Sequence, residues 1–273
     1  MTSSVSGPAQ HTVYALRYAE RATTREHHFY GAIDRATDPM PISYFVWLIT
    51  GPHGPVLVDT GFTASTARRL GRTYITSPRD AVRAAGVDPD SLATVVLSHL
   101  HYDHAGCTAD FPAASFVLQD REMAFWTGRH ARQVASGLGL PHLALPEDVL
   151  ALVAANFTGR VHWVDGDAEI APGISVHRVG GHTPGMQVVR VRTALGYVVL
   201  ASDASHFYEN IERDRPFAVL DSVPGALQAF ADVRSLASDP GLIIPGHDPS
   251  VLDRFPEAGL PSLPGHAVVI GWT

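Results

Sequence analysis

The sequence predicts an α/β fold in which two β-sheets pack face to face and helices cover their outer surfaces. Two successive blocks of the chain each begin with short apolar segments of strand length and continue with segments of helical pattern. The chain has 273 residues, of which 45% are hydrophobic, so it can bury a large core. We therefore expect one domain over residues 11–273, preceded by a flexible N-terminus at residues 1–10.

In the first block, a cluster of glycine and proline between two apolar runs predicts a hairpin. Residues 42–49 and 55–58 flank this cluster, which favours a tight reversal of the chain. Ser77 is a good N-cap, Pro78 suits the first helical turn, and Gly86 favours an end to the helix that lies between them. Further elements are expected as strands at residues 11–18, 27–30 and 93–97, and as a helix at residues 64–70.

The second block predicts more strands than helices. Its strands are expected at residues 115–118, 161–164, 174–179, 186–191, 197–201, 242–244 and 266–270. Its helices are expected at residues 120–126, 146–155 and 224–236. Residues 127–145 mix Gly, His, Arg and Pro without a sustained period, and they predict an irregular excursion or lid.

Composition excludes several classes of protein. The net charge is −7 and no basic cluster is present, so a nucleic-acid partner is not expected. Cys107 is the single cysteine, which rules out an intrachain disulfide and fits a reducing compartment. We see no signal peptide and no apolar run of the roughly 20 residues that cross a bilayer. The sequence thus predicts a soluble cytoplasmic protein without a membrane partner.

One segment carries an unusual density of metal-binding side chains. His99, His101, Asp103 and His104 lie within six residues, directly after the predicted buried strand at residues 93–97. Alternating side chains of an extended segment share a face, so a turn after the strand can aim several of them at one point. Imidazole and carboxylate are the ligands that zinc, iron, cobalt and manganese accept.

Three other strand ends repeat this context. His182 follows one predicted strand in a Gly-Gly-His-Thr-Pro-Gly loop, Asp203 follows another, and His247 follows a third after Pro-Gly. Glycine and other small residues at these points let the backbone bend sharply. A single histidine or aspartate of this kind is most often structural, but the repetition favours one shared site.

The order of these residues resembles the metallo-β-lactamase fold superfamily over about residues 42–248. The resemblance implies an αββα sandwich of two mixed sheets with two metal ions at one edge. It assigns the first metal to His99, His101 and His182, the second to Asp103, His104 and His247, and the bridge between them to Asp203. It leaves Asp59, in a Val-Asp-Thr-Gly element, outside the ligand set.

Within this superfamily, the Ser-His-Leu-His-Tyr-Asp-His-Ala-Gly and Ser-Asp-Ala-Ser-His elements look most like the N-acyl homoserine lactonases, which are quorum-quenching enzymes. These enzymes typically carry tyrosine three residues after the bridging aspartate, where this chain has His206. Tyr208 follows closely, so either His206 or Tyr208 is a candidate to contact the substrate carbonyl. The resemblance also gives a homodimer as an expectation.

These features together predict a dinuclear metal-dependent hydrolase, with zinc as the favoured metal and iron, cobalt or manganese as alternatives. In this hypothesis a metal-bridging hydroxide opens a lactone ring, and Asp103 orients it and passes a proton to the leaving alkoxide. His206 or Tyr208 would stabilise the developing oxyanion. Alternatives are hydrolysis of another ester, cyclic amide or thioester, or a non-hydrolytic metal-binding or redox role.

Overall fold

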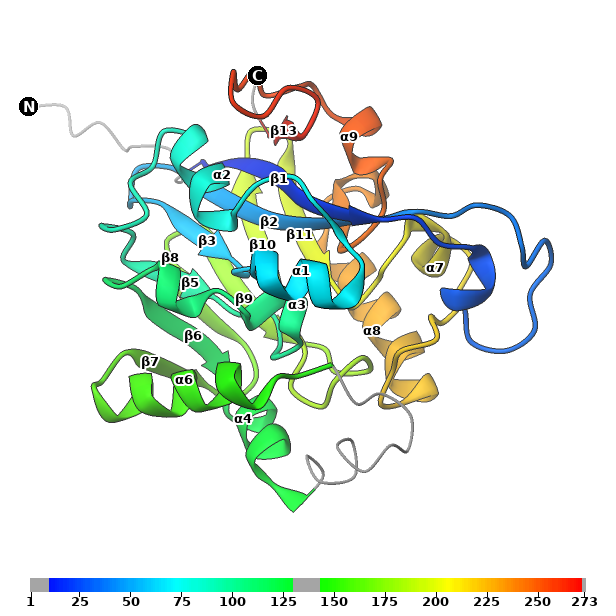
Figure 1. The fold of residues 1–273 in the computed structure, drawn as a ribbon, viewed down its shortest axis with the longest axis horizontal. Coiled ribbons are helices and arrows are strands. Elements are labelled where there is room, and N and C mark those ends of the chain that lie inside the picture. The colour runs from blue at the N-terminus through cyan, green and yellow to red at the C-terminus, as the bar shows by residue number, and fades with distance from the viewer. Residues whose placement is uncertain (1–9, 130–142, 272–273) are drawn as a thin grey trace, which may run out of the picture.

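Two β-sheets and the helices around them make up the computed structural model, which describes residues 10–129 and 143–271. The sheets face each other in the middle of the molecule, and helices lie outside them (Figure 1). This arrangement is the predicted αββα sandwich. Among the described residues, no helix is both long enough and apolar enough to cross a membrane.

The first sheet has eight strands and is mixed. Its order is β13-β1-β2-β3-β5-β6-β7, with β4 paired to β1. The strands are β1 (Thr12–Arg21), β2 (Ile42–Thr50), β3 (Val56–Val58), β4 (Thr73–Tyr74), β5 (Thr94–Val96), β6 (Ser115–Gln119), β7 (Val161–Val164) and β13 (Ala267–Ile270). Strands β3, β5, β6 and β7 run parallel, so their carboxyl ends meet at one edge. The predicted hairpin is confirmed as the antiparallel pair β2 and β3.

The second sheet has five strands in the order β12-β11-β10-β9-β8. They are β8 (Ala168–Ala171), β9 (Ile174–Arg178), β10 (Gln187–Thr193), β11 (Gly196–Ser202) and β12 (Ile243–Pro245). Strands β11 and β12 are parallel, while the other pairs are antiparallel. The segments that follow β11 and β12 therefore leave the sheet at the same edge.

Three of the described α-helices, α1 (Ala64–Leu70), α2 (Pro78–Ala84) and α8 (Val223–Leu236), begin at a Ser or Thr side chain that accepts a backbone N–H. The other described helices are α3 (Tyr102–Ala105), α4 (Asp120–Thr127), α6 (Pro146–Phe157), α7 (Tyr208–Glu212) and α9 (Val251–Arg254). Short 3₁₀ turns lie at Arg25–His27, Thr108–Asp110 and Pro240–Leu242. The Ser77 side chain accepts a hydrogen bond from the Asp80 N–H at the start of α2, which confirms the predicted N-cap.

Three layers of apolar side chains hold the sandwich together. The middle layer lies between the sheets and includes Val58 and Val96 from the first sheet and Val189 and Leu200 from the second. A second layer packs the outer face of the first sheet against α1, α2, α4 and α6, and a third packs the second sheet against α8. Apolar packing on both faces of each sheet thus fixes the positions of the strands, and with them the edge at which the strands end.

Several sequence-based expectations differ from the structure. The strand expected at residues 27–30 is wrong, because this segment starts in the 3₁₀ turn at Arg25–His27. Phe29 is buried by packing on Phe207 and forms only an isolated bridge with Phe217. Strands β4 and β8 and helices α7 and α9 were not expected. The turn expected after the strand at residues 93–97 contains the short helix α3. Most of the excursion expected at residues 127–145 lies outside the described residues.

Candidate metal centre

All seven metal-binding side chains expected from the sequence come together at one edge of the sandwich. His99 and His101 follow β5, Asp103 and His104 lie on α3, and the others follow β9, β11 and β12 of the second sheet. Residues from both sheets therefore face one another across the gap between the sheet edges. Six of the seven are buried, and Asp103 is partly exposed.

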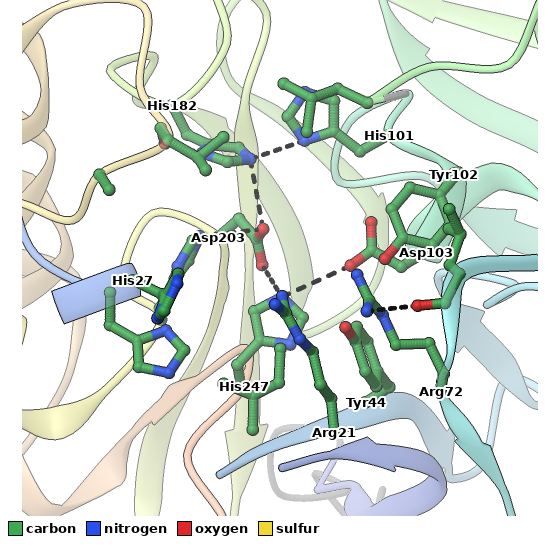
Figure 2. A pocket seen from close by; sticks show the side chains of 17 residues that line it. Arg21, His27, Tyr44, Arg72, His101, Tyr102, Asp103, His182, Asp203 and His247 are labelled. Atoms are coloured by element: carbon green, nitrogen blue, oxygen red, sulfur yellow. Dashed lines mark hydrogen bonds and ion pairs between the residues drawn. The ribbon is translucent and has the colours of Figure 1, made fainter. Parts of the chain in front are cut away.

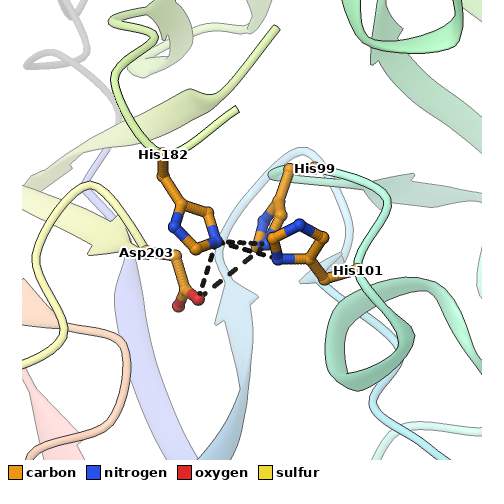
Figure 3. A group of neighbouring side chains, drawn as sticks. All are labelled: His99, His101, His182 and Asp203. Atoms are coloured by element: carbon orange, nitrogen blue, oxygen red, sulfur yellow. Dashed lines mark hydrogen bonds and ion pairs between the residues drawn. The ribbon is translucent and has the colours of Figure 1, made fainter. Parts of the chain in front are cut away.

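The first group consists of His99, His101, His182 and Asp203 (Figure 3), whose potential ligand atoms all lie within 4.8 Å of one another. His182 Nε2 is 3.1 Å from His99 Nε2 and 2.9 Å from His101 Nδ1. The same His182 atom is 3.2 Å from Asp203 Oδ2. Three imidazole nitrogens and one carboxylate oxygen converging in this way form a donor set suited to zinc or a similar divalent ion.

A second group consists of Asp103, His104 and His247, again with potential ligand atoms within 4.8 Å of one another. Asp203 Oδ1 lies 3.3 Å from His104 Nε2 and 3.0 Å from His247 Nε2. The two oxygens of Asp203 thus face different groups: Oδ2 faces the first and Oδ1 the second. This is the geometry expected of a carboxylate that bridges two metal ions.

The protein alone leaves several of these atoms without partners. His104 Nε2 and Asp203 Oδ1 are buried and make no hydrogen bond, although such groups in native proteins are nearly always satisfied. Burial, together with the neighbouring histidines, holds the pKa values of His99 and His101 well below the ordinary value. A neutral imidazole is the form that binds a metal ion. The residues therefore fit two divalent cations.

The outer ring nitrogens are held so that the inner nitrogens point into the site. His182 Nδ1 lies 2.7 Å from the Val219 carbonyl oxygen, and His247 Nδ1 lies 2.9 Å from the Ser43 carbonyl oxygen. A carbonyl can only accept, so each Nδ1 carries a proton, and in the neutral ring the lone pair that can bind a metal ion is then on Nε2. Gly246 completes this arrangement, because a Cβ there would lie 2.6 Å from Asp203 Oδ1.

Asp59 supports the site from behind. Its Oδ2 lies 2.7 Å from His104 Nδ1 and accepts hydrogen bonds from the hydroxyls of Ser98 and Ser202. Its Oδ1 accepts the Ser98 backbone N–H at 2.7 Å. Asp59 is fully buried and has φ of +64°, an uncommon conformation for a residue other than glycine. It thus lies outside both ligand groups and orients His104.

Glu122 of α4 is a supporting residue that the sequence analysis missed. Its Oε1 accepts hydrogen bonds from the Leu100 N–H and Trp126 Nε1, and its Oε2 accepts from the Thr183 hydroxyl and the Gly185 N–H. It therefore ties the segment containing His99 and His101 to the loop containing His182. Burial raises the pKa of this carboxyl, and its four hydrogen bonds oppose that shift.

His206 and Tyr208 occupy different places. His206 lines the pocket beside the two groups, with Nε2 3.2 Å from Asp203 Oδ2 and its ring stacked on Phe217 at 4.0 Å. Burial lowers the pKa of His206 to about 3. Tyr208 is buried in the layer between the sheets, with the Arg254 guanidinium over its ring, and it is not among the residues that line the pocket. Of the two candidates, only His206 borders the space beside the metal groups.

The pocket beside these groups has a volume of about 300 Å³ (Figure 2), at the lower end of the usual range for small-molecule sites. Its wall includes Tyr44, Tyr102 and two arginines, Arg21 and Arg72, that the sequence analysis did not single out. No local signal marks them, since they come from the end of β1, from β2, from α3 and from the segment after α1.

Comparisons with known proteins agree with this geometry. The family model described as "Metallo-beta-lactamase superfamily" matches residues 40–247. An N-acyl homoserine lactonase from Bacillus thuringiensis is 30% identical over 193 residues, which are 64% of this chain and 70% of that protein. N-acyl homoserine lactonase AiiB from Agrobacterium fabrum is 30% identical over 236 residues, 77% of this chain and 80% of that protein.

Solved structures show the same fold. A quorum-quenching N-acyl homoserine lactone lactonase superposes with a TM-score of 0.68 at 24% identity, covering 88% of this chain and 93% of that one. AidC, described as a dizinc quorum-quenching lactonase, superposes with a TM-score of 0.70 at 17% identity. The match covers 89% of this chain and 90% of that one. With two sheets facing each other, ligand groups at their shared edge and a family match over most of its length, the chain belongs to the metallo-beta-lactamase superfamily.

Proposed function

We propose that this protein is a dinuclear metal-dependent lactonase that hydrolyses N-acyl homoserine lactones or related lactones. The observation that carries the proposal is Asp203, whose two oxygens face two separate groups of metal-binding residues at the end of a pocket. The names of the relatives at 30% identity support the lactone as the substrate class.

In this proposal His99, His101 and His182 would hold the first metal, Asp103, His104 and His247 would hold the second, and Asp203 would contribute one oxygen to each. Zinc is the metal we favour, since a set of imidazoles with a carboxylate suits it. Two divalent ions held there would strongly lower the pKa of a coordinated water, to about 7, and would polarise the scissile carbonyl.

We assign proton transfer to Asp103. Its Oδ1 lies 3.8 Å from His104 Nε2, and its Oδ2 lies 3.8 Å from His247 Nε2. Its side chain also borders the pocket. A carboxylate held there can orient the nucleophile and then protonate the leaving alkoxide, a role worth roughly 10²- to 10⁴-fold in rate.

His206 is the candidate for stabilising the carbonyl oxygen. The ring is neutral because burial lowers its pKa to about 3, so it carries one N–H donor. Stacking on Phe217, with 18° between the ring planes, fixes the direction of that donor. A neutral donor of fixed orientation is the kind of group that stabilises a developing oxyanion.

The proposal is tested by measuring metal content and lactone hydrolysis on the same preparation. We expect about two divalent ions per chain, proton release from an N-acyl homoserine lactone, loss of activity after chelation, and recovery when zinc is added back. Asp203→Asn should lower both metal content and rate, while the exposed Asp165→Asn should change neither. Full activity in a metal-free preparation, or two tightly bound ions in Asp203→Asn, would contradict the proposal.

A further inference from the structure

Two arginines in the pocket wall have no assigned role in this reaction. Arg21 is the last residue of β1, and Arg72 follows α1. Both side chains line the same pocket as Asp103, Asp203 and the histidines. Figure 2 shows Arg72 on the same side of the pocket as Asp103, across from His182.

Arg72 is only partly satisfied by the protein. One terminal nitrogen donates to the Leu70 carbonyl oxygen at 2.7 Å, and the side chain interacts with the phenols of Tyr44 and Tyr102. Its Nε is buried and has no hydrogen-bond partner. A guanidinium has five N–H donors in a planar fork, and leaving a buried donor unpaired is unfavourable.

Among the residues that the structure describes, neither arginine forms an ion pair with a carboxylate. By contrast Arg25, four residues after Arg21, places its two terminal nitrogens 2.8 and 2.9 Å from the two carboxylate oxygens of Glu209. Arg72 does lie within reach of the charge of Asp103, but Asp103 belongs to the second metal group, so this half-buried guanidinium has no carboxylate of its own. Arg25 is therefore paired with a carboxylate of the protein, whereas Arg21 and Arg72 remain available to a ligand that enters the pocket.

The balance of charge in the pocket favours an anion. Asp103 and Asp203 are the only acidic side chains among the described residues that line it, and both belong to the metal groups. Two divalent cations would more than neutralise these two carboxylates, and the arginines add two further positive charges. The pocket is then strongly positive in a chain whose net charge is −7, and a concave site of one sign concentrates ligands of the opposite sign.

We propose that the substrate of this site is a lactone that carries a carboxylate, and that Arg72, assisted by Arg21, binds this carboxylate. The inference rests on the proposed lactonase function and, within it, favours related lactones that bear a carboxylate over the uncharged N-acyl homoserine lactones. Ile42 and Leu70 line the same pocket and provide an apolar surface for the ring. A planar carboxylate matches the guanidinium fork and can accept hydrogen bonds from terminal nitrogens of Arg72 and Arg21, whose side chains line the pocket.

The test compares γ-butyrolactone-γ-carboxylate with its carboxamide, which has nearly the same shape but no charge. In the zinc-loaded protein we expect kcat/KM to be about 10- to 100-fold higher for the carboxylate, as charge-assisted hydrogen bonds predict. Arg72→Gln should bring this ratio close to one, Arg72→Lys should retain part of it, and Arg68→Gln on the exposed face of α1 should leave it unchanged. Equal rates for the two compounds in the wild type, or a ratio that survives in an Arg21→Gln, Arg72→Gln double variant, would overturn the inference.

A binding measurement separates this inference from the lactonase proposal. Calorimetric titration of the zinc-loaded protein with glutarate needs no turnover. We expect Arg72→Gln to weaken glutarate binding about 10-fold or more, with metal content and circular dichroism unchanged. If the protein opens no lactone but Arg72 still governs glutarate binding, the anion site stands and the lactonase proposal fails. If neutral lactones are opened and glutarate binds both proteins equally, the anion site fails alone.

Discussion

Replacing Asp59 by asparagine tests whether the carboxylate behind the site sets the affinity for metal. Asp59 accepts four hydrogen bonds, one at Oδ1 and three at Oδ2, and it donates none. Asparagine has one acceptor oxygen and one NH₂ group, so whichever way the amide is turned, its NH₂ faces at least one donor. The negative charge opposite His104 Nδ1 is also lost.

Both effects have a predictable size. Loss of a hydrogen bond to a charged group, with a buried donor left unpaired, costs about 1.5–3 kcal/mol. Loss of a carboxylate that orients a metal-binding histidine lowers metal affinity about 10- to 100-fold. His104 belongs to the second group, so we expect the ion held with Asp103 and His247 to weaken more than the ion of the first group.

Competition with a chelating indicator, carried out on wild type, Asp59→Asn and Ser202→Ala, measures the two zinc affinities. Ser202→Ala is the matched control, because it removes one hydroxyl that donates to Asp59 Oδ2 at 3.2 Å and leaves the pair between Asp59 and His104 in place. We expect its zinc affinities to stay near the wild-type values. Two unaltered affinities in Asp59→Asn would refute the reasoning, as would equal weakening in both variants.

Two further predictions concern stability. Glu122→Gln should lower the free energy of unfolding by about 2 kcal/mol, because an NH₂ group replaces one oxygen that accepts two hydrogen bonds; an unchanged urea midpoint would contradict this. Burial lowers the pKa of His28 to about 4, so the unfolded chain binds more protons than the folded protein between pH 6.5 and 4, and acid destabilises the fold in that window. His28→Gln keeps a donor for the Met40 carbonyl and should remove about 3 kcal/mol of this loss. Urea unfolding at pH 7 and pH 4 measures it, and parallel pH profiles for the two proteins would refute it.

The sequence predicted those parts of the site that have a local signal. His99, His182, Asp203 and His247 each follow an apolar strand directly, and this context is visible without a structure. Because the strands end at one edge of each sheet, the structure brings the four together. The sandwich itself was predictable for the same reason, since most strands and helices have strong periodicity and turn residues.

Other features depend on contacts between segments that are distant in sequence, and no local pattern marks these. Glu122 lies on an ordinary short helix, and its role arises only where Leu100 and Gly185 approach it. Tyr208 is close to Asp203 in sequence, but helix α7 begins there and turns its ring into the core between the sheets. A short aromatic run such as residues 27–30, His-His-Phe-Tyr, is equally compatible with a strand and with side chains that anchor a turn.

The two-sheet origin of the ligands has a consequence for how the protein acquires its metals. The first group combines His99 and His101 with His182 and Asp203, and the second combines Asp103 and His104 with His247. Each group joins residues that follow strands of the first sheet to residues that follow strands of the second, so a nascent chain lacks the first group until Asp203 has been made and the second until His247 has been made. Unlike a zinc finger, whose closely spaced ligands let the ion direct folding, this fold must bring its two halves together first. A complete pair of groups therefore requires both sheets to be in place at their shared edge.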